Sequence, residues 1–143
     1  FALSFGDFNV EIEVPDDHIV AATGLLQNTN EMLLKEQLKQ LKIAKNSFDK
    51  PIIIASQNEA LERERFQSKK YKVWKFKATN VRDFAFASSR KFIWDAQAVK
   101  VGNKTPLAMS FYPKEGNPLW ERESTKAVVN TIKTYSKYTI DYP

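Results

Sequence analysis

The stretch NVRDFAFASSRKFIWDA, residues 80–96, decides the fold because aromatic side chains recur in it at alternate positions. A period of two residues is that of a β-strand, and the polar pair at 88–89 divides the stretch into two strands. Four large aromatics then occupy the core faces: Phe84, Phe86, Phe92 and Trp94. Ile93 and Asp95 alternate with them, and the interleaved charges are expected on the solvated face or in contact with sequence outside this segment. The stretch therefore predicts two half-buried strands of a larger sheet.

The same residues also fit a second interpretation, a surface that binds single-stranded nucleic acid. Such surfaces place aromatic side chains among basic ones, so that bases stack while phosphates are neutralised. The formal net charge is +5, and the densest basic patch precedes the stretch: Lys69, Lys70, Lys72, Lys75 and Lys77. These lysines fall on both faces of one predicted strand, which favours a solvated strand edge. We therefore expect no nucleic-acid partner.

Two more strands are predicted near the start of the chain. Residues 7–14 alternate between apolar side chains and a solvated face that carries Glu11 and Glu13. The turn at 15–18 then returns the chain as a strand over 19–23, which Gly24 ends. The short separation of the two strands predicts that they form a hairpin.

Later strands follow the same reasoning. Residues 51–54 form a short apolar strand, and a strand over 71–78 has Trp74 and Phe76 on its apolar face. Gly102-Asn103 is a two-residue turn signal, and alternation continues beyond it at Leu107, Met109 and Phe111.

Three segments change to the helical period. Leu34, Leu38 and Leu41 form an apolar stripe within 30–45, with Asn30 as the expected N-cap. The sequence SQNE at 56–59 is a capping box that opens a helical turn over 60–65.

A long helix is expected after Asn117, which caps it, with Pro118 at the first helical position. Its apolar stripe consists of Trp120, Ser124, Ala127, Val128, Thr131, Ile132 and Tyr135. The predicted fold class is α+β, mainly β, with saddle-like or sandwich-like antiparallel sheets, a helical insert and a long C-terminal helix.

Composition excludes several kinds of chemistry. The chain of 143 residues has no cysteine, so disulfides and thiolate chemistry are absent, and no apolar run reaches the length of a membrane span. His18 is the only histidine, and with Asp16 and Asp17 it fits an acidic turn better than an ion site. Ser88 and Ser89 lack the motif of a catalytic serine. The residues therefore predict no catalytic, cofactor-binding or metal-binding position.

The segments ATG at 22–24, WKFKATNVRDFAFASSRKFIWDA at 74–96 and YSKYTIDYP at 135–143 resemble zinc aminopeptidases of the aminopeptidase N type, particularly the large bacterial members of this gluzincin metallopeptidase family. The resemblance implies a β-saddle domain ending within 1–80, with its helical insert at 30–65. Residues 81–143 would then be the opening sheet and first helix of a thermolysin-like catalytic domain.

The resemblance also sets the functional expectation. The family's H-E-x-x-H zinc motif does not occur in this sequence, so zinc and peptide substrate would belong to the parent enzyme only. The alternation at Phe1–Phe5 and the aromatic end at 135–143 predict a segment whose main partner is the rest of that polypeptide. Apolar faces left open would favour self-association. An interaction module of β-sandwich type is the remaining alternative, and the compartment, periplasm or cytoplasm, stays open.

Overall fold

A computed structural model describes residues 4–142, so part of the alternation expected at Phe1–Phe5 lies outside the described residues. The elements follow in the order β1 (Gly6–Pro15), β2 (Ile19–Ala22), β3 (Leu25–Leu26), α1 (Thr29–Met32), α2 (Lys35–Ala44), β4 (Ile52–Ala55), α3 (Gln57–Arg65), β5 (Tyr71–Val81), β6 (Phe86–Ser89), β7 (Ile93–Ala98), β8 (Leu107–Tyr112), a short 3₁₀ helix (Lys114–Gly116) and α4 (Leu119–Tyr138). The predicted α+β class, with antiparallel sheets and a long C-terminal helix, is confirmed.

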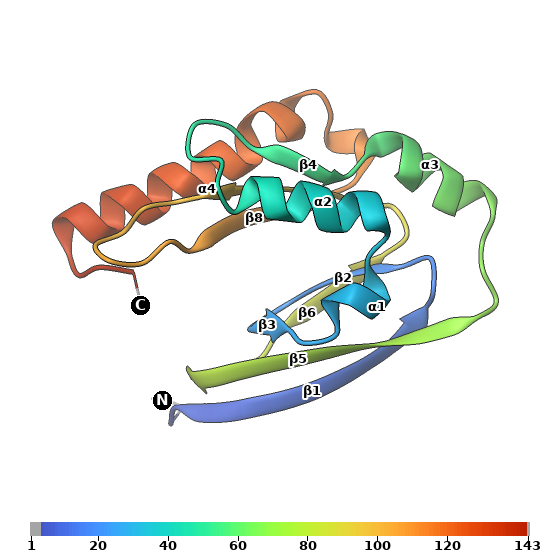
Figure 1. The fold of residues 1–143 in the computed structure, drawn as a ribbon, viewed down its shortest axis with the longest axis horizontal. Coiled ribbons are helices and arrows are strands. Elements are labelled where there is room, and N and C mark those ends of the chain that lie inside the picture. The colour runs from blue at the N-terminus through green and yellow to red at the C-terminus, as the bar shows by residue number, and fades with distance from the viewer. Residues whose placement is uncertain (1–3, 143) are drawn as a thin grey trace.

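The longest sheet has the strand order β1-β5-β3 and forms the lower layer in Figure 1. Strands β1 and β5 run antiparallel, with Val10 opposite Phe76 and Ile12 opposite Trp74. Side chains on their inner faces are buried, whereas Glu11 and Glu13 face solvent as predicted. Alternation thus located both strands and both faces correctly, because only one side of this sheet is covered.

The predicted hairpin between the first two strands is wrong. Strand β1 pairs along its length with β5, and β2 pairs instead with β6 in a separate two-stranded sheet. The turn after Pro15 does form, closed by a hydrogen bond of 2.9 Å from the N–H of His18 to the carbonyl of Pro15. Alternation specifies which face a strand buries but leaves its partner open, and the long strand β5 offers β1 a longer ladder than β2 does.

The third sheet has the order β4-β7-β8 and lies in the upper layer of Figure 1. Every residue of its central strand β7 is buried, so the solvated face expected for the charged Asp95 is wrong. Asp95 faces α4, whereas Trp94 and Ala96 face the core that also contains Trp74. A central strand covered on both faces shows no alternation of burial.

The aromatics of the 80–96 stretch divide between core and surface. Trp94 is buried, and Phe84 and Phe92 are partly buried against the same core. Phe86 is 59% exposed, which contradicts the core position predicted for it. Strand β6 pairs with β2 alone within the described residues, and Phe86 lines a hollow shared with β8 and α4.

The helical segment predicted at 30–45 is two helices, α1 and α2, separated at Leu33 and Leu34. Asn28 precedes α1 and replaces the predicted N-cap Asn30. Its side chain pairs with β5, donating to the carbonyl of Val73 at 2.9 Å and accepting from the N–H of Lys75 at 3.1 Å. This contact with the sheet fixes where α1 begins, and the sequence gives no sign of it.

The capping box predicted at 56–59 is confirmed. The Ser56 hydroxyl accepts from the N–H of Glu59 at 3.3 Å, and the Glu59 carboxylate accepts from the N–H of Ser56 at 2.6 Å. Reciprocal bonds of this kind satisfy two free N–H groups at the start of α3.

Helix α4 begins at Leu119, one residue later than expected, and Pro118 takes the N-cap position predicted for Asn117. The side chain of Asn117, one residue before the cap, accepts from the N–H of Glu121 at 3.3 Å. The helix packs on β8 and β7. Its buried residues are Thr125 and Val129, beside the partly buried Ile132, whereas Trp120 and Tyr135 of the predicted stripe are exposed. Helix α4 therefore faces the core with one edge of the predicted stripe, and the centre of that stripe is exposed.

The predicted domain boundary at residue 80 stays a prediction. Strand β2 lies before this boundary and pairs with β6 beyond it, and β4 of the predicted insert pairs with β7. One hydrophobic cluster joins Ile12 and Trp74 to Trp94 and Ala96. The two predicted parts thus share strand pairing and core.

Candidate functional site

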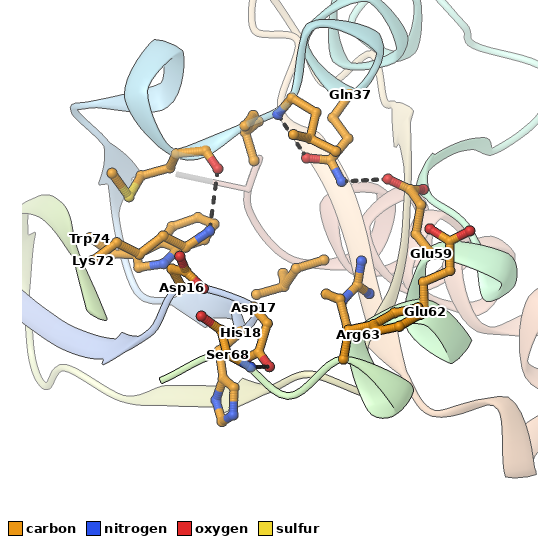
Figure 2. A pocket seen from close by; sticks show the side chains of 15 residues that line it. Asp16, Asp17, His18, Gln37, Glu59, Glu62, Arg63, Ser68, Lys72 and Trp74 are labelled. Carbon is orange, nitrogen blue, oxygen red and sulfur yellow. Dashed lines mark hydrogen bonds between the residues drawn. The ribbon is translucent and has the colours of Figure 1, made fainter. Parts of the chain in front are cut away.

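A cavity of about 380 Å³ lies between the β1–β2 turn, the α1–α2 break, α3 and β5 (Figure 2). It is lined by Asp16, Asp17, His18, Ile19, Met32, Leu33, Leu34, Gln37, Glu59, Glu62, Arg63, Phe66, Ser68, Lys72 and Trp74. This volume falls in the ~300–1,000 Å³ range of small-molecule sites. Polar and charged groups converge in it from three separate regions of the sequence, which makes it the candidate functional site.

Asp17 forms the floor of the cavity and is paired with Arg90. One carboxylate oxygen accepts from Nε of Arg90 at 3.2 Å and from the N–H of Ser68 at 2.9 Å. Burial acts to raise the pKa of Asp17, but the hydrogen bonds from Ser68 and Arg90 outweigh it and lower the pKa overall. The other carboxylate oxygen is buried and has no hydrogen-bond partner. Asp17 is therefore an anchored carboxylate with one oxygen uncommitted.

His18 also lines the cavity, beside Asp17, but its imidazole contacts a partner on another strand. Its imidazole points away from Arg63 in Figure 2 and lies with Nδ1 3.3 Å from the hydroxyl of Ser88. Burial lowers the pKa of His18, and the charge of Arg90 lowers it further, so the ring is neutral at pH 7. Among residues 4–142 no carboxylate hydrogen-bonds to the ring, so the pair lacks the third group that orients a catalytic base.

Sequence reasoning treated Ser88 and His18 separately and missed this pair, because 70 residues separate them. The pairing of β2 with β6 brings them together, with Ile19 opposite Ser89 and Val20 opposite Ser88. A correct prediction of that strand pair would have revealed the contact.

Two cations line opposite sides of the cavity. Arg63 on α3 donates through Nε to the carbonyl of Arg90 at 2.9 Å and through Nη2 to that of Phe92 at 2.6 Å. Nζ of Lys72 on β5 lies 3.4 Å from the carbonyl of Met32 and 5.0 Å from the centre of the Trp74 ring. Burial lowers the pKa of both cations. None of the six ion pairs found within residues 4–142 includes either one.

The upper wall of the cavity is a hydrogen-bond chain that runs through Gln37 and the carboxylate of Glu59. The Gln37 amide donates to Glu59 at 2.8 Å and accepts from the N–H of Leu34 at 3.1 Å. Glu59 also closes the capping box with Ser56, so its carboxylate is fully engaged. This chain ties α2 to α3 and holds the wall in place.

A second polar cluster lies outside the cavity, between α4 and the β7-β8 pair. It contains Asp95, Ser110, Tyr112 and Thr125, all of them buried. Burial raises the pKa of Asp95, and it also raises that of Tyr112. The cluster has no opening to solvent, so we assign it a structural role.

The residues considered for nucleic-acid binding are not brought together. Trp94 lies in the core, and Lys75 forms a surface ion pair of 3.1 Å with Glu11. Lys69, Lys70 and Lys77 are exposed, while Lys72 on the inner face of β5 belongs to the cavity. Aromatic stacking groups and basic groups therefore do not share one exposed face.

Residues 4–142 also contain no group of three His, Cys, Asp or Glu side chains close enough to hold a metal ion. None of the helices described over this range is long and apolar enough to cross a membrane. Comparison of the chain with protein-family models, curated proteins and solved structures found no match.

A shallow apolar hollow crosses β6, β8 and α4 on another face. The α4 apolar surface, as we name it, consists of the exposed side chains around this hollow: Phe86, Met109, Val128 and Tyr142. Further exposed apolar residues of α4 are Leu119, Trp120, Tyr135 and Tyr138. A helix that already packs one face on a sheet thus presents a second apolar face to solvent.

Proposed function

We propose that this chain is a non-catalytic part of a zinc-dependent aminopeptidase, where it forms scaffold beside the catalytic cleft. The parent enzyme would remove N-terminal residues from peptides with zinc-activated water. The observation that carries the proposal is the α4 apolar surface. Contiguous apolar patches on folded domains mark surfaces that contact other protein, and this patch spans a helix and two strands.

The occupant proposed for this surface is the rest of the parent polypeptide. The resemblance of the 74–96 stretch to the aminopeptidase N family supports this choice, since the family's catalytic domain continues beyond its first long helix. The mostly apolar residues around the hollow suit a permanent internal contact, whereas transient interfaces are more polar.

The residues of this chain do not themselves fit a zinc site. His18 is engaged with Ser88, and Asp17 is engaged with Arg90 and Ser68. No third ligand accompanies them within residues 4–142. We therefore assign no catalytic step to this chain, and its proposed contribution is the position of its surfaces.

The first experiment tests inactivity. The purified chain is incubated with zinc and an aminoacyl arylamide, and arylamine release and bound zinc are measured. We expect neither turnover nor stoichiometric zinc. Turnover that depends on stoichiometric zinc would contradict the proposal.

The second experiment tests the α4 apolar surface by sedimentation of the isolated chain. We expect concentration-dependent self-association, which Val128→Glu reduces because it places a charge in the patch. Asn130→Glu adds the same charge at an exposed position of α4 outside the patch and should leave association unchanged. Equal sedimentation of all three proteins would argue against a contact surface.

An interaction module that binds a separate protein would use the same surface. The coding sequence that follows this segment distinguishes the two functions, because the aminopeptidase proposal requires an H-E-x-x-H motif there. A continuous reading frame without that motif would favour the interaction module.

A further inference from the structure

Strand β1 has a free edge. It is an outer strand of the sheet β1-β5-β3 and borders the lower layer in Figure 1, and β5 is its only partner within the described residues. An edge strand of ten residues presents a row of backbone N–H and C=O groups to solvent. Such a row is a template on which another strand can pair. The free edge of β1 is therefore a candidate interaction surface.

The backbone groups at this edge are identified through the residues opposite them on β5. Glu11 lies opposite Lys75. The N–H of Lys75 donates to Oδ1 of Asn28 at 3.1 Å, and its C=O accepts from the N–H of Gln27 at 2.8 Å. Both backbone groups of Lys75 thus point away from β1, so Glu11 and Lys75 are a non-hydrogen-bonded pair of the antiparallel ladder. The N–H and C=O of Glu11 therefore point to the free edge.

Glu13 repeats this arrangement two residues later. It lies opposite Val73, whose C=O accepts from Nδ2 of Asn28 at 2.9 Å and so also points away from β1. Alternate residues of a strand have the same orientation, so the backbone groups of Asn9 face outward as well. The outward N–H and C=O groups of the edge thus belong to Asn9, Glu11 and Glu13, in the part of β1 that pairs regularly with β5.

The side chains of these residues select the charge of a partner. All three are exposed on the outer face of the sheet, and the carboxylate of Glu11 pairs with Nζ of Lys75 at 3.1 Å. A strand added on the other side of β1 would place its own outward side chains beside Glu11 and Glu13. Basic side chains would be attracted there and acidic ones repelled, so the edge favours a basic partner.

The inner face of β1 sets the rest of the partner's pattern. Phe8 and Val10 on this face are only partly buried, whereas Ile12 and Val14 lie in the core. Apolar side chains of an added strand would cover the exposed parts of Phe8 and Val10, and burial of that area favours binding. Because successive residues of a strand point to opposite faces, the partner alternates basic and apolar side chains.

We propose that the free edge of β1 binds an extended segment of another polypeptide, in which Lys or Arg alternates with apolar residues. The segment pairs antiparallel to β1, as β5 does, and becomes the fourth strand of the sheet. The inference stands on this edge alone and does not depend on the aminopeptidase proposal.

A second copy of this chain does not fit the edge. Two β1 strands paired edge to edge would set Glu11 and Glu13 of one copy against the same carboxylates of the other, and like charges across strands are unfavourable. The other edge strands of the described chain are β2, β3, β4, β6 and β8, and none of them contains Lys or Arg. The basic strand must therefore come from a different polypeptide.

The test is a titration of the ¹⁵N-labelled chain with the peptide acetyl-TVKVKVKVT-amide. Its matched controls are acetyl-TVEVEVEVT-amide and the lysine peptide methylated on the backbone nitrogen of each lysine. We expect the lysine peptide to shift the amide signals of Asn9, Glu11 and Glu13 with a dissociation constant of about 1 mM or tighter. Neither control should produce a saturable shift. Absence of a shift with the lysine peptide, or equal binding of either control, would overturn the proposal.

Glu11→Pro tests the backbone contact. The N–H that it removes lies outside the ladder of β1 and β5, so the sheet is kept while the free edge loses a donor. Binding of the lysine peptide should weaken about tenfold or more. Glu11→Gln keeps the N–H and removes only the charge, so it should weaken binding about threefold. Equal affinity of the two variants, or a dimer of the wild type that Glu11→Pro abolishes, would contradict the proposed occupant.

Glu13→Lys tests the charge without relying on a proline. It should weaken binding of the lysine peptide about fivefold and give the glutamate peptide a saturable shift. This gain of binding does not arise from misfolding. Asp49→Lys makes the same change of charge at an exposed position between α2 and β4, and it should alter neither affinity. The same response in both variants would show that net charge, and not the edge of β1, governs binding.

Discussion

The hydroxyl of Tyr112 donates a hydrogen bond of 2.5 Å to the carboxylate of Asp95, across the pair of strands on which helix α4 lies. Thr125 on α4 donates to the other oxygen of the same carboxylate, and its hydroxyl lies 2.7 Å from that of Ser110. A buried carboxylate therefore connects both strands to the helix. Because every oxygen in this network has a partner, the network favours one position of α4 over its alternatives.

The Thr125 hydroxyl is expected to stabilise the fold through this network. Thr125→Val keeps the shape of the side chain but leaves Asp95 with one donor fewer, which should cost about 1–3 kcal/mol of unfolding free energy. Thr131→Val makes the same change at an exposed position of α4 and should stay within about 0.5 kcal/mol of the wild type. Urea denaturation of the three proteins measures both effects. Equal stability of the two variants would show that the network contributes nothing.

Asp95 should also give the stability a distinct pH dependence. Burial raises its pKa above the ordinary value of 3.8, so the folded state holds the proton to higher pH than the unfolded state. The resulting stabilisation is complete below 3.8 and is lost as the pH rises through the folded pKa. Asp95→Asn has no carboxyl group to deprotonate at this position, so the variant does not lose this stability as the pH rises. Relative to the wild type, the variant should therefore gain stability between acid and neutral pH.

The measurement is a series of urea denaturations of the wild type and Asp95→Asn over that pH range. Asp83→Asn is the control, because it removes an exposed carboxylate of the same kind. If Asp95→Asn instead became less stable relative to the wild type as the pH rises, the effect would have the opposite sign. That result would refute a raised pKa for Asp95.

Local patterns predicted the strands but not their surroundings. The apolar alternation of β1 and β5 was sufficient to predict both strands and their buried faces, because one face of their sheet is open to water. The same rule placed Asp95 on a solvated face, and the structure buries it completely. Its donors, Tyr112 and Thr125, follow 17 and 30 residues later; the pairing of β7 with β8 brings the first to it and the packing of α4 brings the second.

The candidate site was beyond sequence reasoning for a related reason. Arg63 and Lys72 belong to a helix and a strand that carry many other charges, and nothing local marks these two. What the two share is a place in the lining of one cavity, which is a property of the folded chain. The acidic turn at 16–18 was noticed, but its role as the floor of a cavity depends on α3 lying opposite.

Gly24 is expected to tolerate no side chain. Its φ is +88°, a region that L-residues rarely adopt, and an added Cβ would lie 2.7 Å from the carbonyl carbon of Lys77. Since that neighbour is backbone of β5, it cannot move aside without disturbing the strand pairing. Gly24→Ala should therefore destabilise the fold by about 1–3 kcal/mol or more.

Gly6→Ala provides the matched comparison, because an added Cβ there meets nothing within 4 Å. Thermal denaturation of both variants should show a large decrease in Tm for Gly24→Ala and little change for Gly6→Ala. A similar Tm for the two variants would mean that Gly24 lies farther from the backbone of β5 than the structure shows.

Asp17 should show the opposite pH dependence to Asp95. Its pKa lies below the ordinary value of 3.8, because the hydrogen bonds from Ser68 and Arg90 outweigh the effect of burial. The carboxylate therefore contributes stability that is present above 3.8 and is lost as the pH falls through the folded pKa. Asp17→Asn should destabilise the fold at neutral pH, and its difference from the wild type should shrink in strong acid. Asp16→Asn is the control in these denaturation measurements, because Asp16 lies in the same turn and its side chain makes no hydrogen bond among residues 4–142. A deficit of Asp17→Asn that persisted undiminished below the folded pKa would show that the ion pair with Arg90 is not its source.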